Sequence, residues 1–218
     1  MHTKRTAAGQ EKGIKWTTTP RGPHRKAESI PLGRIMINLG YADKTREAHA
    51  IIVGGMAQVD GVVRKDKNYG VGLMDVVSIP KVKKDVRLVT SKAGIVLKDI
   101  DPKEAKIKPC KIIGKRTLPG GKTQLTLHDG TTILCDKKVA VNDTAVLESP
   151  GRKLMEIIPY ETGNQAVIVS GRHRGYKGEL KEVVKGTAAR GSLTKVGDIQ
   201  TLTEYVFVIG RDKPVVDA

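Results

Sequence analysis

The segment Gly121-Lys122-Thr123, which follows Pro119-Gly120, comes closest in this sequence to a motif with chemistry of its own. A phosphate-binding P-loop needs a first glycine five positions before the second one, and Arg116 occupies that position. The residues after Thr123 alternate as a strand does, whereas a P-loop opens a helix. Gly70-Val71-Gly72 fails in a similar way as a dinucleotide-binding motif, because Asp75 occupies the position of the third glycine. We therefore expect neither nucleotide hydrolysis nor dinucleotide binding.

Cysteine and histidine side chains offer no better candidate for catalysis. Cys110 and Cys135 are the only cysteines, and they do not have Cys-x-x-Cys spacing. A structural zinc site would need two more well-placed ligands, and no histidine pair supplies them. His128-Asp129 has no nucleophile-elbow serine, and neighbours in a hairpin cannot form a triad by themselves. We expect two reduced thiols in or near a core, no catalytic residue, no metal and no cofactor, and hence no enzyme.

The charge of the chain points instead to a polyanionic partner. Its 218 residues include 39 Lys and Arg against 23 Asp and Glu, a formal net charge of +16. Aromatic residues make up only 3% of the chain, so few side chains could stack on bases. This composition favours contact with the phosphates and the shape of folded RNA. No signal peptide and no apolar run long enough to span a membrane is recognisable, so we expect no membrane partner.

Residues 1–27 form a strongly basic segment, with seven Lys or Arg and one acidic residue, Glu11. The segment has no helical or strand period and cannot bury enough apolar surface to fold alone. It is either a solvated tail or an arm that orders along nucleic acid. Trp16 would either stack on RNA or pack on the protein, and both remain open. The arm residues that we expect to contact RNA are Lys4, Arg5, Lys15, Arg21, Arg25 and Lys26.

Residues 30–64 have the pattern of two short helices followed by a tight hairpin. One helical stripe consists of Leu32, Ile35, Met36 and Leu39. Ser29 is placed to cap this helix, and Gly40 to end it. A second helix begins at Asp43, and Asp60-Gly61 predicts the hairpin turn. An ordinary helical hairpin or a DNA-binding helix-turn-helix also fits the periodicity, although the hairpin argues against the latter.

This helical segment is not basic as a whole, since residues 28–64 hold four basic and four acidic side chains. RNA would therefore bind to one face of it. Lys44 and Arg46 open the second helix, where backbone N–H groups also favour phosphate. We expect these two residues to form one patch with three that follow the hairpin turn, namely Arg64, Lys65 and Lys67. The alternative is that Lys44 and Arg46 are solvated charges, with Arg46 facing Asp43 or Glu47.

The middle of the chain, residues 81–160, has short apolar segments between turns, which suggests a small β-barrel. Residues 101–104 predict a single helical turn. Lys115, Arg116 and Lys122 form a basic loop that either contacts RNA or is merely solvated. The strands predicted here and just before it are 73–79, 86–90, 95–100, 108–115, 124–128 and 131–134.

Residues 163–180 combine an apolar strand, a glycine-bounded basic loop and a return strand. Gly171, Gly175 and Gly178 permit tight turns with positive φ. A short rigid loop presents cations to phosphates at a lower entropic cost than a flexible one. The basic residues that we expect to bind RNA here are Arg172, His173, Arg174 and Lys177. Apolar segments at 183–184, 199–202 and 205–209 could complete a small barrel.

Four segments resemble known families. Residues 30–64 resemble the S4-type RNA-binding module, and residues 163–180 resemble the KOW motif of SH3-like barrels in ribosomal proteins and transcription factors. Residues 60–81, DGVVRKDKNYGVGLMDVVSIPK, and 205–214, YVFVIGRDKP, are similar to the ribosomal protein family S4e of the archaeal and eukaryotic small subunit. This last resemblance runs over nearly the whole chain, and the short C-terminal tail is like that of archaeal members.

The resemblance implies a multi-domain α+β protein of the small (30S) ribosomal subunit. Its parts would be a basic arm (1–27), an S4-type RNA-binding domain with an αα-hairpin and β-strands (28–80), a central β-rich domain (81–160) and a KOW SH3-like β-barrel with the C-terminal tail (161–218). It implies a cytoplasmic structural protein that binds and stabilises folded small-subunit ribosomal RNA and supports translation. The implied partners are this RNA and neighbouring ribosomal proteins, with no small-molecule substrate.

Two other classes of function fit the sequence less well but remain open. A KOW-containing transcription or translation factor would bind RNA or the ribosome transiently, and would dissociate at moderate salt. An RNA-modifying enzyme is conceivable, because S4-type modules are often attached to such enzymes. No segment of this chain resembles an attached catalytic domain.

Overall fold

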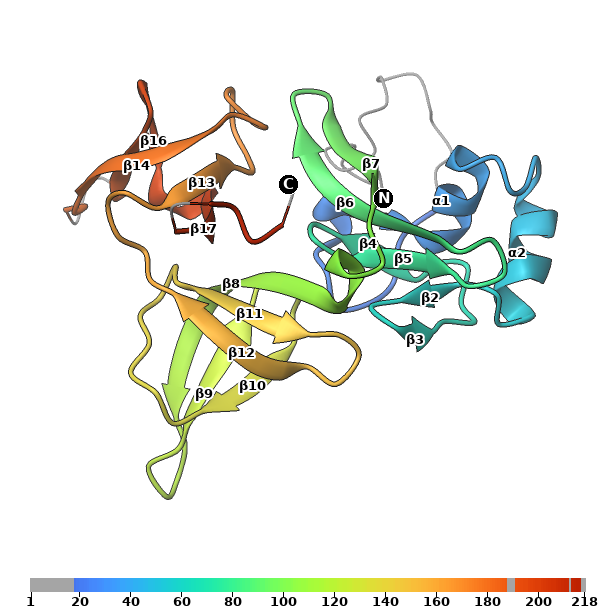
Figure 1. Cartoon of the computed structure of the whole chain (residues 1–218), viewed down its shortest axis with the longest axis horizontal. Helices are drawn as coiled ribbons and strands as arrows, with labels where there is room; N and C mark the ends of the chain where they lie inside the picture. The colour runs from blue at the N-terminus through green and yellow to red at the C-terminus, as the bar shows by residue number, and fades with distance from the viewer. Residues whose placement is uncertain (1–17, 188–190, 212, 217–218) are drawn as a thin grey trace. The chain divides into compact units, whose positions relative to one another are not determined.

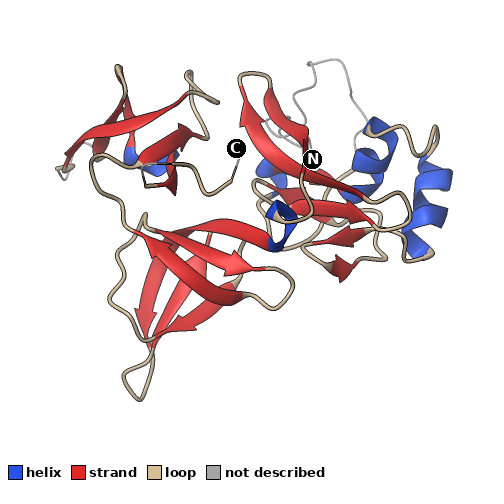
Figure 2. Ribbon diagram, viewed as in Figure 1, coloured by secondary structure: helices blue, strands red, loops and turns tan. Residues whose placement is uncertain are grey.

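A computed structural model describes residues 18–187, 191–211 and 213–216. Within these ranges the chain is mostly β-strand, with two α-helices and three short 3-10 helices, Lys26–Glu28, Glu104–Lys106 and Thr203–Tyr205 (Figure 2). This agrees with the expected mixture of helices and sheets at the level of fold class. No helix in the described ranges is long and apolar enough to cross a membrane. Lys4, Arg5, Lys15 and Trp16, for which we predicted roles in the arm, lie outside the described residues.

The chain divides into two compact units, which we describe separately. Unit 1 comprises residues up to Val89 together with Ala93–Lys108 and Glu148–Arg152. Unit 2 comprises Thr90–Lys92, Pro109–Leu147 and Lys153–Ala218. The segment 81–160, expected to form a central domain, is thus shared between both units.

The two helices of unit 1 pack against each other as the apolar pattern predicts. Helix α1 spans Leu32–Asn38 and α2 spans Thr45–Val53 (Figure 1). Leu32, Ile35 and Met36 are fully buried, and Gly40 follows α1 with a φ of +76°. The prediction that Ser29 caps α1 was wrong. Ser29 lies in strand β1 (Ser29–Pro31), and its hydroxyl donates to the Arg25 carbonyl at 3.1 Å.

Unit 1 also contains two sheets, one with five strands and one with two. The five-stranded sheet has the order β3-β2-β5-β6-β7, formed by Gln58–Val59 (β2), Val62–Val63 (β3), Val76–Ile79 (β5), Lys84–Ser91 (β6) and Gly94–Ile100 (β7). Asp60 and Gly61 both have positive φ, as the predicted hairpin turn requires. β1 pairs antiparallel with β4, Gly70–Gly72. The strand predicted at 73–79 is present as β5 but begins three residues later, at Val76.

Unit 2 is built on two further five-stranded sheets. The first has the order β10-β9-β8-β11-β12, formed by Ile107–Thr117 (β8), Thr123–Leu127 (β9), Thr132–Cys135 (β10), Thr144–Glu148 (β11) and Lys153–Ile158 (β12), and it curves strongly in Figure 1. The second has the order β16-β15-β14-β13-β17, formed by Gln165–Ile168 (β13), Lys177–Val184 (β14), Leu193–Val196 (β15), Ile199–Leu202 (β16) and Val206–Gly210 (β17). Cys110 and Cys135 are free thiols buried in the core of the first sheet, as predicted. β11, β12 and β15 were not predicted.

Candidate nucleic-acid interface

Tyr69 is the centre of a basic surface on unit 1. The guanidinium carbon of Arg64 lies 4.5 Å from the centre of the Tyr69 ring, a cation–π contact. Burial raises the pKa of Tyr69, and the positive charge of Arg64 opposes that rise only in part. Arg64 is half-buried, while the neighbouring Lys65 is exposed. We call Arg21, Arg64, Lys65 and Lys67 the Tyr69 patch; they are the basic residues of the segment that leads to Tyr69 and of the backbone segment that pairs with it.

The end of the N-terminal arm is tied to this patch through its backbone. The N–H of Arg21 donates to the Asn68 carbonyl at 2.7 Å, and the N–H of Gly70 donates to the Arg21 carbonyl at 2.7 Å. The Arg21 side chain is exposed, as are those of Arg25 and Lys26. Arg25 makes an exposed ion pair with Glu28 at 3.9 Å. This part of the arm, which we expected to be either a solvated tail or ordered along nucleic acid, is therefore attached to the protein body.

A buried ionic network fixes the same part of the arm. The Nε2 atom of His24 lies 2.8 Å from Oδ2 of Asp75, and this oxygen also accepts the N–H of Gly72 at 2.9 Å. The Nζ atom of Lys108 lies 2.6 Å from Oδ1 of Asp75 and 2.7 Å from Oδ2 of Asp60. His24, Asp75 and Lys108 are all buried. The carboxylate of Asp75 thus joins the arm to the start of β8; it lies 51 residues after His24 and 33 residues before Lys108 in the sequence.

The pKa values of the two carboxyl groups of this network shift in opposite directions. Burial alone would raise the pKa of Asp75, but the charges of Lys108 and His24 and their hydrogen bonds outweigh it and hold that pKa well below its usual range. Burial and the negative charge of Asp75 raise the pKa of Asp60, although Lys108 opposes the rise. Asp75 is therefore the anion that neutralises the two buried bases.

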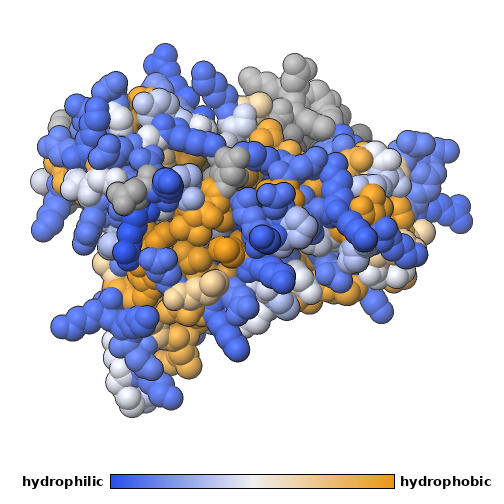
Figure 3. Space-filling model, viewed as in Figure 1, coloured by the Kyte–Doolittle hydropathy of each residue, from blue (hydrophilic) through white to orange (hydrophobic). Residues whose placement is uncertain are grey.

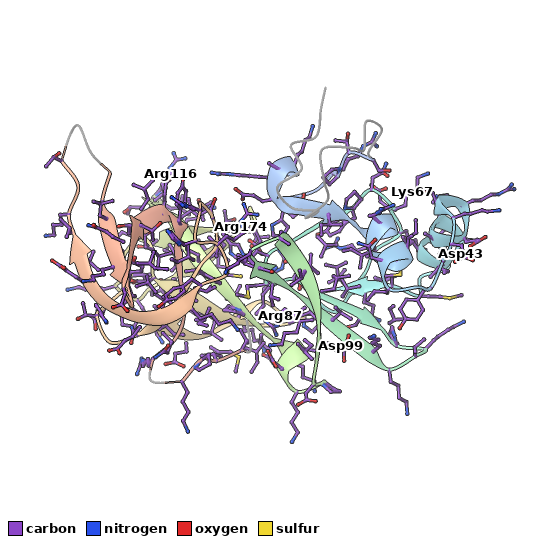
Figure 4. All side chains as sticks on the ribbon, turned by 90° about the horizontal axis from the view of Figure 1, so that it is seen from above. Asp43, Lys67, Arg87, Asp99, Arg116 and Arg174 are labelled. Carbon is purple, nitrogen blue, oxygen red and sulfur yellow. The ribbon has the colours of Figure 1, made fainter. Side chains whose placement is uncertain are left out.

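Lys44 and Arg46 lie at the start of α2, and both are exposed. The carboxylate of Glu47 accepts the N–H groups of Asp43 at 3.0 Å and of Lys44 at 3.3 Å. An acidic side chain therefore already occupies the first turn of α2, where we expected phosphate to be favoured. Figure 4 shows Asp43 beside this helix.

The Lys67 carbonyl accepts the N–H of Gly33 at 2.8 Å, which places Lys67 at the first turn of α1. Lys44 and Arg46 follow the other end of α1, about 10 Å away along a seven-residue helix. Figure 4 labels Lys67 next to α1. The two groups of cations that we expected to form one patch thus flank α1 at its opposite ends.

The glycine-bounded loop of unit 2, residues 169–176, is closed by hydrogen bonds at its base. The N–H of Gly175 donates to the Ile168 carbonyl at 2.7 Å, and that of Ile168 to the Tyr176 carbonyl at 2.9 Å. Gly171 and Gly175 have φ of +85° and +80°, as the glycine spacing predicted. The loop presents Arg172 and His173 to solvent; Lys177 is also exposed and Arg174 is half-buried.

Gly178 does not have the predicted positive φ, because it lies within strand β14. A Cβ atom there would lie 3.2 Å from Cε1 of Tyr176, so close approach of this ring is what favours glycine. The loop has a further support from a buried cation. The Nζ of Lys111 donates to the carbonyls of Glu204 at 2.8 Å and Val206 at 2.7 Å, and the carbonyl of Tyr205, between them, accepts the N–H of Val169 at 2.8 Å.

The structure pairs the backbone of Arg21 with Tyr69, next to the segment that carries Arg64, Lys65 and Lys67. It places Arg172, His173 and Arg174 on one loop and Lys177 directly after it. Sequence reasoning missed the residues that hold these surfaces, above all His24, Asp75, Lys108 and Lys111. An acidic residue inside an apolar strand pattern was the only signal for Asp75. Over the described ranges, no group of three or more His, Cys, Asp or Glu could hold a metal ion.

Comparison with known proteins gives consistent matches over most of the chain. Residues 82–154 match the model of the family "Ribosomal family S4e". The small ribosomal subunit protein eS4 of Methanosphaera stadtmanae is 39% identical over 208 residues, which is 92% of this chain and 86% of that protein. The protein of the same name from Archaeoglobus fulgidus is 38% identical over 232 residues, covering 100% of this chain and 97% of that protein. The crystal structure of the 30S ribosomal protein S4e from Thermoplasma acidophilum is similar with a TM-score of 0.77 and 31% identity, and covers 87% of this chain and 99% of that one.

Proposed function

The chain belongs to the ribosomal protein family S4e, and from that premise we propose that it is a structural component of the small ribosomal subunit. It binds and stabilises folded small-subunit ribosomal RNA and so supports translation in the cytoplasm. The observation that carries this proposal is the similarity, over more than nine tenths of the chain, to archaeal proteins named small ribosomal subunit protein eS4. The protein performs no catalysis in this role.

The basic surfaces of the two units support this function with a physical mechanism. A net charge of +16 and few aromatic residues suit a protein that neutralises phosphates rather than one that reads single bases. The Tyr69 patch and the glycine-bounded loop both hold their cations on backbone fixed by hydrogen bonds. Cations held in this way lose little conformational entropy on binding. Ribosomal RNA and neighbouring ribosomal proteins are the partners.

We assign finer roles on the same basis. The segment 28–80 acts as an S4-type RNA-binding module, and the segment 161–218 as a KOW SH3-like barrel, with the central segment 81–160 between them. The helical pair and the hairpin turn of the first, and the glycine-bounded loop of the second, support these assignments. RNA is contacted by the arm residues Lys4, Arg5, Lys15, Arg21, Arg25 and Lys26, by Lys44, Arg46, Arg64, Lys65 and Lys67, and by Arg172, His173, Arg174 and Lys177.

Sedimentation of cell lysate through a sucrose gradient at high salt tests this function. The protein is followed by mass spectrometry across the gradient. A structural component migrates with the small subunit at salt concentrations that remove transient factors. Release to the top of the gradient, with intact subunits below, would contradict the proposal and favour a transiently bound KOW factor.

A further inference from the structure

The far end of the β8–β9–β10 ladder in unit 2 gathers cations that the proposed RNA contacts do not include. β8 ends at Thr117, which pairs with Thr123, the first residue of β9, and Thr123 in turn pairs with Cys135, the last residue of β10. These ends of the three strands therefore lie side by side at the same end of the sheet. We call the basic residues beside this end of the sheet the hairpin end; they are Lys115, Arg116, Lys122, Lys137 and Lys138.

The charge at the hairpin end is concentrated and accessible. Five basic residues meet one acidic residue, Asp136, in the segments 115–123 and 136–138, a local net of +4. All five basic side chains are exposed. Figure 3 shows the tip of the β8–β9 hairpin at the lower left: the tip itself has intermediate hydropathy, and hydrophilic side chains surround it. Figure 4 labels Arg116 on this part of unit 2.

Hydrogen bonds fix the backbone of both segments of the hairpin end, the β8–β9 turn and the loop after β10. The N–H of Leu118 donates to the Lys122 carbonyl at 2.8 Å, and that of Gly121 to the Leu118 carbonyl at 3.2 Å. The loop after β10 is fixed because Lys115 Nζ donates to the carbonyl of Val139, a core residue, at 3.0 Å. Lys137 and Lys138 are thus carried by a segment anchored at both sides, and the backbone that carries the cations of the hairpin end is preorganised.

The tip of the hairpin leaves room for another molecule to approach the backbone. Gly120 and Gly121 have φ of +86° and +76°, and a Cβ atom at either position would meet nothing within 4 Å. Neighbouring strands are about 4.8 Å apart, so three strands spread the cations over roughly 10 Å. A nucleic-acid backbone carries charges at a similar density, with one phosphate per 3.4 Å or so of each strand.

We propose that the hairpin end binds the phosphate backbone of base-paired ribosomal RNA, as an RNA contact separate from those assigned above. The segments 115–123 and 136–138 contain no aromatic residue, so this surface cannot stack on unpaired bases. It can neutralise phosphates on the outside of an RNA helix, with Gly120-Gly121 close to the backbone. This inference rests on the proposed function and adds a second RNA-contact surface in unit 2.

A charge-removal variant tests the proposal in the full chain. Arg116, Lys122, Lys137 and Lys138 are replaced together by Gln, and Lys115 is kept because it anchors the loop. The matched control replaces four exposed lysines elsewhere by Gln, at Lys81, Lys153, Lys185 and Lys213. The measurement is the affinity for an in vitro transcript of archaeal small-subunit ribosomal RNA as a function of salt.

We expect the hairpin-end variant to bind at least about tenfold more weakly at 0.1 M salt, with a slope of log affinity against log salt that is less steep by about 3. The control, with the same net charge, should keep a slope close to that of the unmodified protein. Equal behaviour of the two variants would overturn the inference and leave the proposed function intact. Failure of the unmodified protein to bind the transcript would overturn both.

Directed cleavage provides a second measurement that does not depend on affinity. Lys122→Cys can be labelled selectively with an iron chelate that produces hydroxyl radicals, because Cys110 and Cys135 are buried. Lys81→Cys serves as the control position. Cleavage within a base-paired segment from position 122, and not from position 81, is expected. Cleavage confined to unpaired loops would overturn the inference. Absence of cleavage from position 122, in a protein–RNA complex that does form, would also overturn it and would favour an acidic protein partner.

Discussion

The Tyr69 patch of unit 1 and the glycine-bounded loop of unit 2 present cations in two different ways. The arm reaches the Tyr69 patch through a buried network in which one carboxylate binds a histidine 51 residues away and a lysine from β8. The loop of unit 2 takes its shape from two positive-φ glycines within five residues of one another. The conformation of the first surface therefore depends on distant parts of the chain, whereas that of the second depends largely on residues within the loop itself.

This difference predicts that one substitution outside the Tyr69 patch destabilises unit 1 strongly. Asp75→Asn keeps the size of the side chain but removes the charge that neutralises Lys108 and His24. An uncompensated buried charge costs about 3–5 kcal/mol. Hydrogen exchange, measured by mass spectrometry at increasing urea concentrations, should show that unit 1 unfolds at a lower urea concentration in this variant than in the unmodified protein.

The matched control is Asp198→Asn, which removes an exposed ion pair of 3.0 Å with Lys181. Exposed pairs are screened by water and contribute little to stability, so unit 2 should barely change. Similar effects of the two substitutions would mean that the buried network does not hold unit 1 together.

A pH titration tests whether unit 2 also depends on a distant buried ion. Burial lowers the pKa of Lys111 to about 8, against an ordinary value of 10.5, and the charge of Glu204 opposes this only in part. Between these pH values the unfolded chain binds a proton that the folded chain does not. The stability of unit 2 should therefore rise from about pH 8 to 10.5, by up to about 3 kcal/mol. Lys111→Met, measured by the same urea titration, should abolish this rise; a rise that persists would assign it to other groups.

Gly72→Ala tests the position of the His24 ring without removing any charge from the buried network. A Cβ atom at Gly72 would overlap Nδ1 of His24, so the ring must move away from Asp75. We expect a loss of about 1–3 kcal/mol in unit 1 and faster tryptic cleavage at Arg21 and Arg25. Gly114→Ala is the control, because its Cβ would make an ordinary contact of 3.6 Å with Thr126. Unchanged cleavage in Gly72→Ala would show that the arm is held without His24.

Gly171→Ala should have the smallest effect and should stay local. The φ of +85° disfavours a side chain, and the new Cβ would lie 3.3 Å from the Tyr205 ring. We expect a cost of about 1 kcal/mol, seen as faster hydrogen exchange in residues 169–176 only. Faster exchange throughout unit 2 would contradict the view that this loop is encoded locally.

The sequence predicted the local features of the fold well and the long-range ones poorly. The apolar stripe of α1, the turn at Asp60-Gly61 and the turns at Gly171 and Gly175 each depend on neighbours a few residues away. The prediction for Ser29 failed because pairing of β1 with β4, over 40 residues apart, overrides a local capping preference. The pairing of β2 with β5, whose partners lie 18 to 20 residues apart, is likewise not indicated by any periodicity.

The candidate site was predictable in its cations but not in what positions them. Exposed Arg and Lys side chains stand out in composition and near glycine turns, and most of those predicted within the described ranges are exposed. The burial of Asp75, Lys108 and Lys111 arises from tertiary contacts, and in the sequence the two lysines look like ordinary surface charges. The docking of Arg21 against Tyr69 likewise follows from backbone pairing between distant segments.

The central claim is that two separately built surfaces bind ribosomal RNA, and the salt dependence of affinity tests it most directly. One variant replaces Arg21, Lys65 and Lys67 by Gln, a second replaces Arg172, Arg174 and Lys177 by Gln, and a third combines them. For an archaeal small-subunit ribosomal RNA transcript, each triple variant should give a slope of log affinity against log salt that is less steep by about 2–3, and the combined variant should show the sum. Slopes equal to that of the unmodified protein, or a full loss of salt dependence from either triple variant alone, would contradict the account.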